Sequence, residues 1–230
     1  MRIGGLQKLT LIDYPGKLAA IVFTQGCNLR CGYCHNPELV LSSRFESRVQ
    51  EDEVLSFLDR RRLFLNGVVI SGGEPTLQKD LMDFMKKVKH MGFSIKLDTN
   101  GTLPEVLGEI IQSRLIDYIA MDIKTSLERY DQITGVSCLL EKIKESIRLI
   151  RNSGIEFEFR TTAVKPFCSR EDLGRIQHLM GAFDRYQIQI FQPGEKILDK
   201  GLLTENHYSE EEVVALRNEF SHSETSLEGR

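Results

Sequence analysis

The chain has 230 residues, of which 41% are hydrophobic and 27% are charged, and its net charge at pH 7 is -3. This composition is typical of a soluble globular domain and excludes a collagen-like, coiled-coil or disordered chain. The slightly acidic balance speaks against a protein that binds nucleic acid by electrostatic attraction.

No apolar run approaches the roughly 18 residues of a membrane span, and the first residues lack the apolar core of an export signal. We therefore expect a cytoplasmic protein with neither a membrane nor a nucleic acid as its partner. We also expect one domain over residues 1–230, with a core over about 5–193 and a C-terminal extension over 194–230.

Six short segments rich in β-branched and aromatic residues are predicted to be strands, and several are followed by Gly, Pro, Asn or Asp. They are residues 20–24, 68–70, 93–97, 118–121, 156–160 and 186–191.

Segments with the apolar spacing of helices lie between these strands. They are residues 51–64, 80–91, 103–112, 139–150 and 172–180, followed by an acidic, helix-prone stretch at 209–220. The apolar face of the first helix is expected to extend to Leu63, and Thr102 is the expected N-cap of the third.

The alternation of strands and helices predicts a parallel sheet with helices packed outside it. Six strands are too few for the closed eight-stranded barrel, so an open or partial barrel is favoured. A doubly wound sheet is the competing topology. In both folds, ligands bind at the carboxyl ends of the strands.

Three of the five cysteines, Cys27, Cys31 and Cys34, follow the first predicted strand with the spacing C-x3-C-x2-C. Thiolates suit zinc, copper(I) or iron–sulfur clusters, but a structural zinc site needs four ligands. A four-iron cluster ordinarily takes four cysteines, so three predict a cluster with one iron open to another molecule. The isolated Cys138 and Cys168 are expected to be inert or buried thiols.

Two loops follow the next two predicted strands. In Ser71-Gly72-Gly73-Glu74-Pro75 the paired glycines would let the backbone approach a ligand closely. The string Asp98-Thr99-Asn100-Gly101 is composed of turn-forming residues, and it is equally a candidate pocket wall.

Charged residues end the fourth and fifth predicted strands. Alternation places Asp122 and Lys124 on the same face, where they could meet the two ends of a zwitterion or pair with each other. The guanidinium of Arg160 suits a carboxylate, either of a ligand or of a nearby side chain.

With these motifs, the chain resembles the radical S-adenosylmethionine (SAM) enzymes, whose signature is C-x3-C-x2-C. The strings at 13–17 (Asp-Tyr-Pro-Gly-Lys) and 33–37 (Tyr-Cys-His-Asn-Pro) resemble the glycyl-radical-enzyme activases in particular. The type that activates anaerobic ribonucleoside-triphosphate reductase is the most similar, and pyruvate formate-lyase activating enzyme shares the second string. The resemblance runs from about residue 5 to residue 191 and implies an α/β fold, the partial (β/α)6 barrel of the radical SAM type.

The resemblance implies that the three clustered cysteines bind a 4Fe-4S cluster and that SAM occupies the open iron. By the same resemblance, the Gly-Gly-Glu-Pro loop meets the SAM amino group, Lys124 its carboxylate and Asp122 its ribose region. Asp98 and Thr99 could also hold a monovalent cation. The implied cofactor-binding residues are Tyr33, His35, Gly72, Gly73, Glu74, Asp98, Thr99, Asp122, Lys124 and Arg160.

The contact that the resemblance leaves open lies after the last strand. Activases have a His in a Pro-Phe-His string there, but this chain has Gln192-Pro193, so the ribose contact stays unassigned.

The implied activity is that of a radical SAM oxidoreductase. One electron, delivered by a flavodoxin or ferredoxin, would cleave SAM to a 5′-deoxyadenosyl radical, which takes a hydrogen from a glycine of a partner glycyl radical enzyme. The expected partner is anaerobic ribonucleoside-triphosphate reductase.

Three alternatives stand beside this reading. They are a pyruvate formate-lyase-type activase, a small-molecule radical SAM enzyme such as a 7-carboxy-7-deazaguanine synthase, and a zinc module without catalytic activity. Residues 38–71 contain no cysteine, which speaks against the activases that carry a ferredoxin-like insert.

Overall fold

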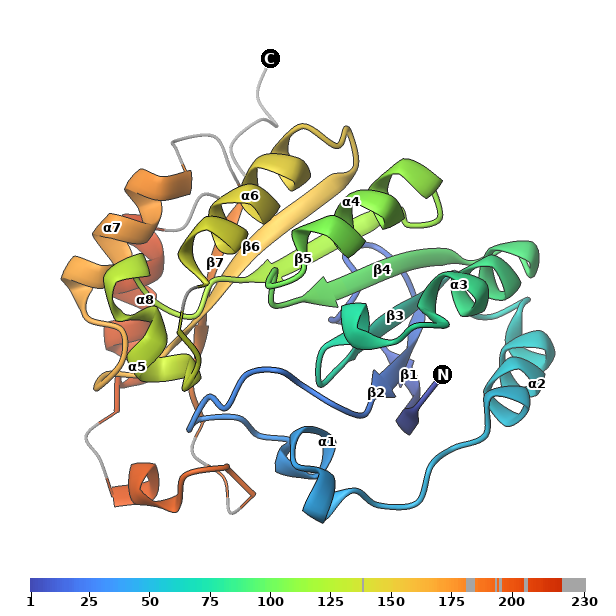
Figure 1. Ribbon diagram of the computed structural model, residues 1–230, viewed down its shortest axis with the longest axis horizontal. Coiled ribbons are helices and arrows are strands. Elements are labelled where there is room, and N and C mark those ends of the chain that lie inside the picture. Colours follow the sequence, from blue (N-terminus) through green and yellow to red (C-terminus); the bar gives the residue numbers. More distant parts are fainter. Residues whose placement is uncertain (138, 181–184, 193, 195, 205–206, 221–230) are drawn as a thin grey trace.

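The computed structural model describes residues 1–137, 139–180, 185–192, 194, 196–204 and 207–220 (Figure 1). Its strands follow one another in the sheet in chain order. They are β1 (Ile3–Thr10), β2 (Ala19–Thr24), β3 (Gly67–Gly72), β4 (Ser94–Thr99), β5 (Tyr118–Asp122), β6 (Glu156–Ala163) and β7 (Tyr186–Ile190).

The helices between and after the strands include every one that the apolar spacing predicts. They are α1 (Pro37–Val40), α2 (Glu51–Arg61), α3 (Leu81–His90), α4 (Pro104–Ser113), α5 (Tyr130–Thr134), α6 (Leu140–Arg151), α7 (Arg170–Met180) and α8 (Glu210–Phe220).

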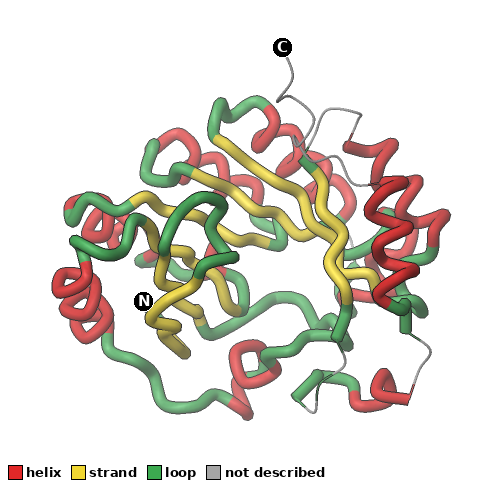
Figure 2. The backbone as a smooth tube through the Cα atoms, turned by 180° about the vertical axis from the view of Figure 1, so that it is seen from behind, coloured by secondary structure: helices red, strands yellow, loops and turns green. Residues whose placement is uncertain are grey.

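The sheet is parallel from β2 to β7, and only β1 runs antiparallel to its neighbour. The strand order has no reversal, which excludes the doubly wound topology, whose order reverses at its centre. The sheet curves with α3, α4 and α6 on its outer side, as Figures 1 and 2 show from opposite directions. The expected α/β partial barrel with six parallel strands is therefore confirmed.

The strands bury apolar side chains on both faces. Val68 and Ile70 of β3 belong to the large core between the sheet and the helices. Val69, between them in sequence, belongs to a smaller cluster with Tyr14 and Tyr118. Because successive side chains of a strand point to opposite faces, this second cluster fills the inside of the curved sheet.

Strand β1 is absent from the expected elements. Its sequence begins Ile-Gly-Gly and continues with exposed polar residues, so it lacks the alternation that marks a half-buried strand. It pairs with β2 through a register that shifts twice, and it lies at the edge of the sheet. Pairing with a neighbour, which local sequence does not reveal, therefore makes this segment a strand.

Two local expectations about helices were wrong. Helix α2 ends at Arg61, and Leu63 lies beyond it with 89% of its surface exposed. The N-cap of α4 is Leu103, whose apolar side chain cannot accept a hydrogen bond, and the Thr102 hydroxyl donates to the side chain of Asn100.

The last part of the described chain contacts the cysteine-bearing loop. After β7, the Leu198 N–H donates to the Cys34 carbonyl (3.0 Å) and the Asp199 N–H to the Gly32 carbonyl (2.8 Å). Helix α8 lies beside β7 (Figure 2), where Arg217 Nε donates to the Ile188 carbonyl at 2.6 Å.

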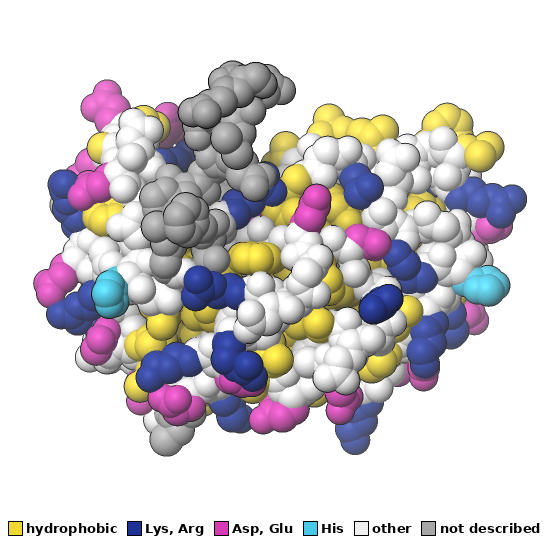
Figure 3. Space-filling view, turned by 90° about the horizontal axis from the view of Figure 1, so that it is seen from above, with side chains coloured by type: hydrophobic (Ala, Val, Ile, Leu, Met, Phe, Trp, Pro, Cys, Tyr) yellow, Lys and Arg dark blue, Asp and Glu magenta, His cyan; other side chains and the backbone are white. Residues whose placement is uncertain are grey.

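Figure 3 shows acidic and basic side chains interspersed over one face of the molecule. None of the helices within the described ranges is long or apolar enough to cross a membrane. Cys168 is fully buried, as expected, and Cys138 lies outside the described residues.

Candidate functional site

A cavity with an empty volume of about 600 Å³ opens at the carboxyl ends of the parallel strands. Most of the predicted site residues line it, but His35 and Arg160 do not. The lining consists of Cys27, Leu29, Cys31, Tyr33, Cys34, Val40, Ser71, Gly72, Gly73, Glu74, Asp98, Thr99, Asn100, Asp122 and Lys124.

The three clustered cysteines lie on the loop between β2 and α1 and face the cavity together. Other parts of the chain fix this loop: the Gly26 N–H donates to the Leu39 carbonyl and the Arg30 N–H to the Thr134 carbonyl, each at 2.7 Å. These backbone bonds position the loop that bears the three thiols.

Burial raises the pKa of all three thiols, that of Cys27 to about 11, so the free thiols are protonated at neutral pH. Metal binding must displace those protons. Among the residues that the structure describes, no three ligating side chains converge as a single metal ion requires. The chemistry of this donor set, three thiols that line one cavity, fits a 4Fe-4S group.

The paired glycines let the paired ends of β2 and β3, and the loops that follow them, lie at contact distance. Gly72 has φ 111°, and a Cβ added there would lie 2.3 Å from the Thr24 nitrogen. A Cβ on Gly73 would lie 2.1 Å from the Gly26 carbonyl oxygen. The Gly73 N–H donates to the Thr24 carbonyl at 2.9 Å, so the glycines dock the loop after β3 onto the cysteine-bearing loop.

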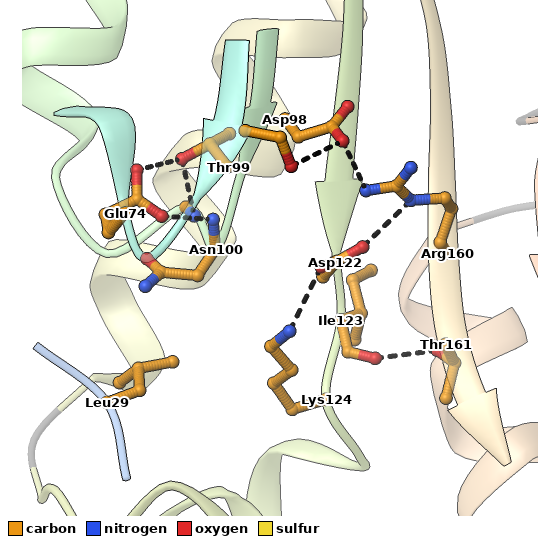
Figure 4. A network of polar contacts seen from close by, with 12 residues as sticks. Leu29, Glu74, Asp98, Thr99, Asn100, Asp122, Ile123, Lys124, Arg160 and Thr161 are labelled. Carbon is orange, nitrogen blue, oxygen red and sulfur yellow. Dashed lines mark hydrogen bonds and ion pairs between the residues drawn. The ribbon is translucent and has the colours of Figure 1, made fainter. Parts of the chain in front are cut away.

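Glu74 is 1% exposed, and four protein donors reach its carboxylate. Its oxygens accept from the Thr76 N–H (3.1 Å) and hydroxyl (2.6 Å), the Thr99 hydroxyl (2.8 Å) and the Asn100 N–H (2.7 Å). Burial raises the pKa of Glu74, and these four donors oppose that shift. Glu74 therefore ties the loops after β3 and β4 together (Figure 4), while its contact with SAM stays a prediction.

Asp122 and Lys124 pair with each other, with 3.1 Å between Oδ2 and Nζ. Arg160 lies behind them and places Nε 2.9 Å from Asp122 Oδ1 and Nη2 3.4 Å from Asp98 Oδ2 (Figure 4). Burial opposes ionisation of Asp122, but the charges of Arg160 and Lys124 outweigh it and hold its pKa below the ordinary value. Arg160 therefore acts on the cavity through two carboxylates.

The charged row continues inside the curved sheet through Lys96, which sequence reasoning missed. Lys96 is 2% exposed, and its Nζ donates to the Asp13 carbonyl (2.6 Å) and to Glu158 (3.2 Å). It also lies 3.5 Å from Asp98 Oδ1, an oxygen without a hydrogen-bond partner in the described structure. The signal in the sequence is a lysine two residues before Asp98 on a buried strand, hence on the same face.

Tyr33 and His35, which flank Cys34, lie in different surroundings: one side chain is buried and the other is exposed. The Tyr33 ring is buried beside the cavity, and its hydroxyl has no hydrogen-bond partner among the described residues. His35 is exposed, with Nε2 2.7 Å from the Gln192 carbonyl oxygen and its ring 5.2 Å from that of Phe191. The structure thus brings His35 to the end of β7, and its contact with adenosine stays a prediction.

Comparisons with known proteins agree with this arrangement. The pattern of the radical SAM superfamily matches residues 21–176, which include the cysteines, both glycines, Asp122 and Lys124. "Putative glycyl-radical enzyme activating enzyme MJ1227" of Methanocaldococcus jannaschii is 39% identical over 198 residues, covering 83% of this chain and 80% of that protein.

More distant matches extend the same picture. Pyruvate formate-lyase-activating enzyme of Clostridium pasteurianum is 29% identical over 78% of this chain and 76% of that enzyme. The crystal structure of Streptococcus suis SuiB shares the fold with a TM-score of 0.65 at 17% identity, over 86% of this chain and 44% of that one. The chain belongs to the radical SAM superfamily and, within it, to the family of glycyl-radical enzyme activating enzymes.

Proposed function

We propose that this chain uses a 4Fe-4S cluster and SAM to generate a glycyl radical on a partner enzyme. The observation that carries the proposal is one cavity that three thiols and the Asp122–Lys124 pair line together. The match to an activating enzyme over most of both chains supports the same function.

Each group in the cavity has a task that its chemistry fits. Cys27, Cys31 and Cys34 would hold three irons, and the fourth iron would face the cavity. The Lys124 ammonium carries two further donors beyond its bond to Asp122 and would bind the SAM carboxylate. When bound, the cluster and SAM together supply reductive C–S cleavage and hence the hydrogen-abstracting radical.

The remaining residues position these groups. Gly72, Gly73 and Glu74 would fix the loop after β3 against the cysteine-bearing loop and so set the spacing of the two walls. Arg160 holds Asp98 and Asp122 in place from behind. A monovalent cation beside Asp98 and Thr99 is a further proposal; Asp98 Oδ1 accepts no hydrogen bond in the described structure, and it lies 3.5 Å from the Lys96 ammonium.

The partner that we propose is anaerobic ribonucleoside-triphosphate reductase, supported by the strings at 13–17 and 33–37. A glycine α-carbon is a suitable target because no Cβ shields it. The electron donor would be a low-potential flavodoxin or ferredoxin.

The test is to reconstitute the chain anaerobically, reduce it and add SAM with the reductase or, separately, with pyruvate formate-lyase. Electron paramagnetic resonance (EPR) should show a stable glycyl doublet on the reductase. A doublet only on the lyase would reassign the partner. Formation of 5′-deoxyadenosine without either doublet would retain the SAM chemistry but refute both partners. The Cys31→Ser variant is the control and should give neither product.

A further inference from the structure

A ring of three polar side chains joins the loop after β4 to the cysteine-bearing loop. Asn28 Nδ2 donates to the Thr102 hydroxyl (2.7 Å), which donates to Asn100 Oδ1 (2.6 Å). Asn100 Nδ2 closes the ring by donating to Asn28 Oδ1 at 3.0 Å. None of these three side chains carries a charge, and the proposed function gives none of them a role.

The ring fixes which way the Asn100 amide points. Its oxygen accepts from both the Thr102 N–H (3.0 Å) and the Thr102 hydroxyl, so the nitrogen must lie on the opposite side. The backbone N–H of Asn100 is held separately by Glu74. Asn100 is 5% exposed, so water does not compete freely for its amide hydrogens.

One amide hydrogen of Asn100 goes to Asn28, and the second faces the Cys27 sulfur at an N···S distance of 3.9 Å. The Leu29 N–H approaches the same sulfur at 3.4 Å. Within the described ranges, no other side chain donates to the sulfur of Cys27, Cys31 or Cys34. Figure 4 shows Asn100 between Glu74 and Leu29 of the cysteine-bearing loop.

We propose that the Asn100 amide is a tuning group for the cluster: its hydrogen bond to Cys27 stabilises the reduced state. The inference rests on the proposed function in one respect, since Cys27 must ligate a cluster iron. Hydrogen bonds to ligand sulfurs are among the factors that set iron–sulfur potentials. An N–H dipole aimed at a thiolate favours the extra negative charge that one-electron reduction adds, so losing it should lower the midpoint potential.

The experiment is a potentiometric titration of anaerobically reconstituted protein with dithionite and mediators, followed by the EPR signal of the reduced cluster. One electron enters, [4Fe-4S]2+ becomes [4Fe-4S]+, and no bond or proton changes. The variants are Asn100→Ala and Asn100→Ser, in which Ser is too short to reach the sulfur. The matched control is Ser146→Ala, which removes a bond to the Gly101 carbonyl (2.7 Å) in the same loop without touching the ring.

At a fixed potential, we expect both Asn100 variants to have a reduced-to-oxidised ratio about threefold or more below that of the wild type. A tenfold change would correspond to about 59 mV for one electron. The Ser146→Ala variant should keep the wild-type midpoint. Equal midpoints in all four proteins, at equal iron and sulfide content, would overturn the inference. So would an equal shift in Ser146→Ala, which would assign the effect to loop packing.

A second measurement needs no substitution. Wild-type protein labelled with 15N in its asparagine side-chain amides should show a 15N hyperfine coupling to the reduced cluster by pulsed EPR. Its absence would overturn the inference even if the variants failed to assemble. Wild-type protein that takes up no four-iron cluster would refute the proposed function as well, which separates the two failures.

Discussion

Gly72 offers a stringent test of the reasoning about the site, because its backbone conformation and its close neighbours both disfavour a side chain. A second glycine, Gly92, shares the backbone conformation but not the close neighbours. Gly72 and Gly92 both have left-handed backbones, with φ 111° and 92°. A Cβ on Gly92 would meet nothing within 4 Å, whereas one on Gly72 would lie 2.3 Å from the Thr24 nitrogen and 2.6 Å from its oxygen. The Gly92→Ala variant therefore measures backbone strain alone, and Gly72→Ala measures strain together with the clash.

The expected cost follows from these contacts. A left-handed backbone costs an L residue about 1–2 kcal/mol, of which about 0.4–1 kcal/mol is regained through the less flexible unfolded chain. Gly92→Ala should therefore lower the free energy of unfolding by about 1 kcal/mol. Gly72→Ala adds overpacking of about 1–3 kcal/mol and weakens the Gly73–Thr24 hydrogen bond, worth about 1 kcal/mol. The difference between the variants should be about 2–4 kcal/mol.

The assay is urea unfolding of the protein without cofactors, followed by far-ultraviolet circular dichroism. The free energy in water and the slope with urea are compared between the two variants and the wild type. Free energies that agree within about 0.5 kcal/mol would refute the claim that the ends of β2 and β3 leave no room for a Cβ at Gly72.

Three further outcomes can be measured. Lys124→Met should weaken SAM binding to the reconstituted protein roughly ten- to hundredfold in calorimetry, because a charge-assisted bond contributes about 1.5–3 kcal/mol, and an unchanged Kd would remove Lys124 from the site. The buried Asp172 accepts hydrogen bonds that outweigh burial and lower its pKa to about 2, below the ordinary 3.8. The contribution of ionised Asp172 to the free energy of unfolding is therefore complete above about pH 4 and is lost as the pH falls towards 2. Asp172→Asn should remove this part of the fall in the free energy of unfolding between pH 4 and 2. The control Asp83→Asn, at an exposed carboxylate, should not. Lys96→Met should cost up to about 3–5 kcal/mol in urea unfolding, because the buried Glu158 would keep only the more distant Arg160 (3.9 Å) as a cation. Adding Glu158→Met should restore much of that loss, and no restoration would contradict the pairing with Lys96.

The parts of the fold that sequence predicted correctly are those set by local pattern. The apolar stretch in β3 and the amphipathic spacing in α3 each identify their own element, so six parallel strands and their helices could be placed. The motifs at 27–34, 71–75 and 122–124 could be expected to meet, because parallel strands bring their carboxyl ends to one edge.

What sequence did not predict depends on partners distant in the chain. β1 forms by pairing with β2, and Lys96 becomes a buried cation only because β6 places Glu158 beside it. Asn100 reads as a turn former until the cysteine-bearing loop supplies Asn28 and Cys27 as its acceptors. For Arg160 the sequence left a ligand, a peptide backbone and a nearby carboxylate open as partners, and its pairing with Asp122 follows from the register between β5 and β6.

The two backbone bonds from Leu198 and Asp199 to the cysteine-bearing loop have a consequence for the order in which the protein matures. A chain is synthesised from its N-terminus, so the cysteines at 27–34 leave the ribosome long before residues 198 and 199 exist. The sheet from β1 to β6 can assemble in that interval, whereas the loop lacks two of its hydrogen bonds until residues 198 and 199 have been made. Iron and sulfide delivered before that point would meet a loop that these two bonds do not yet hold.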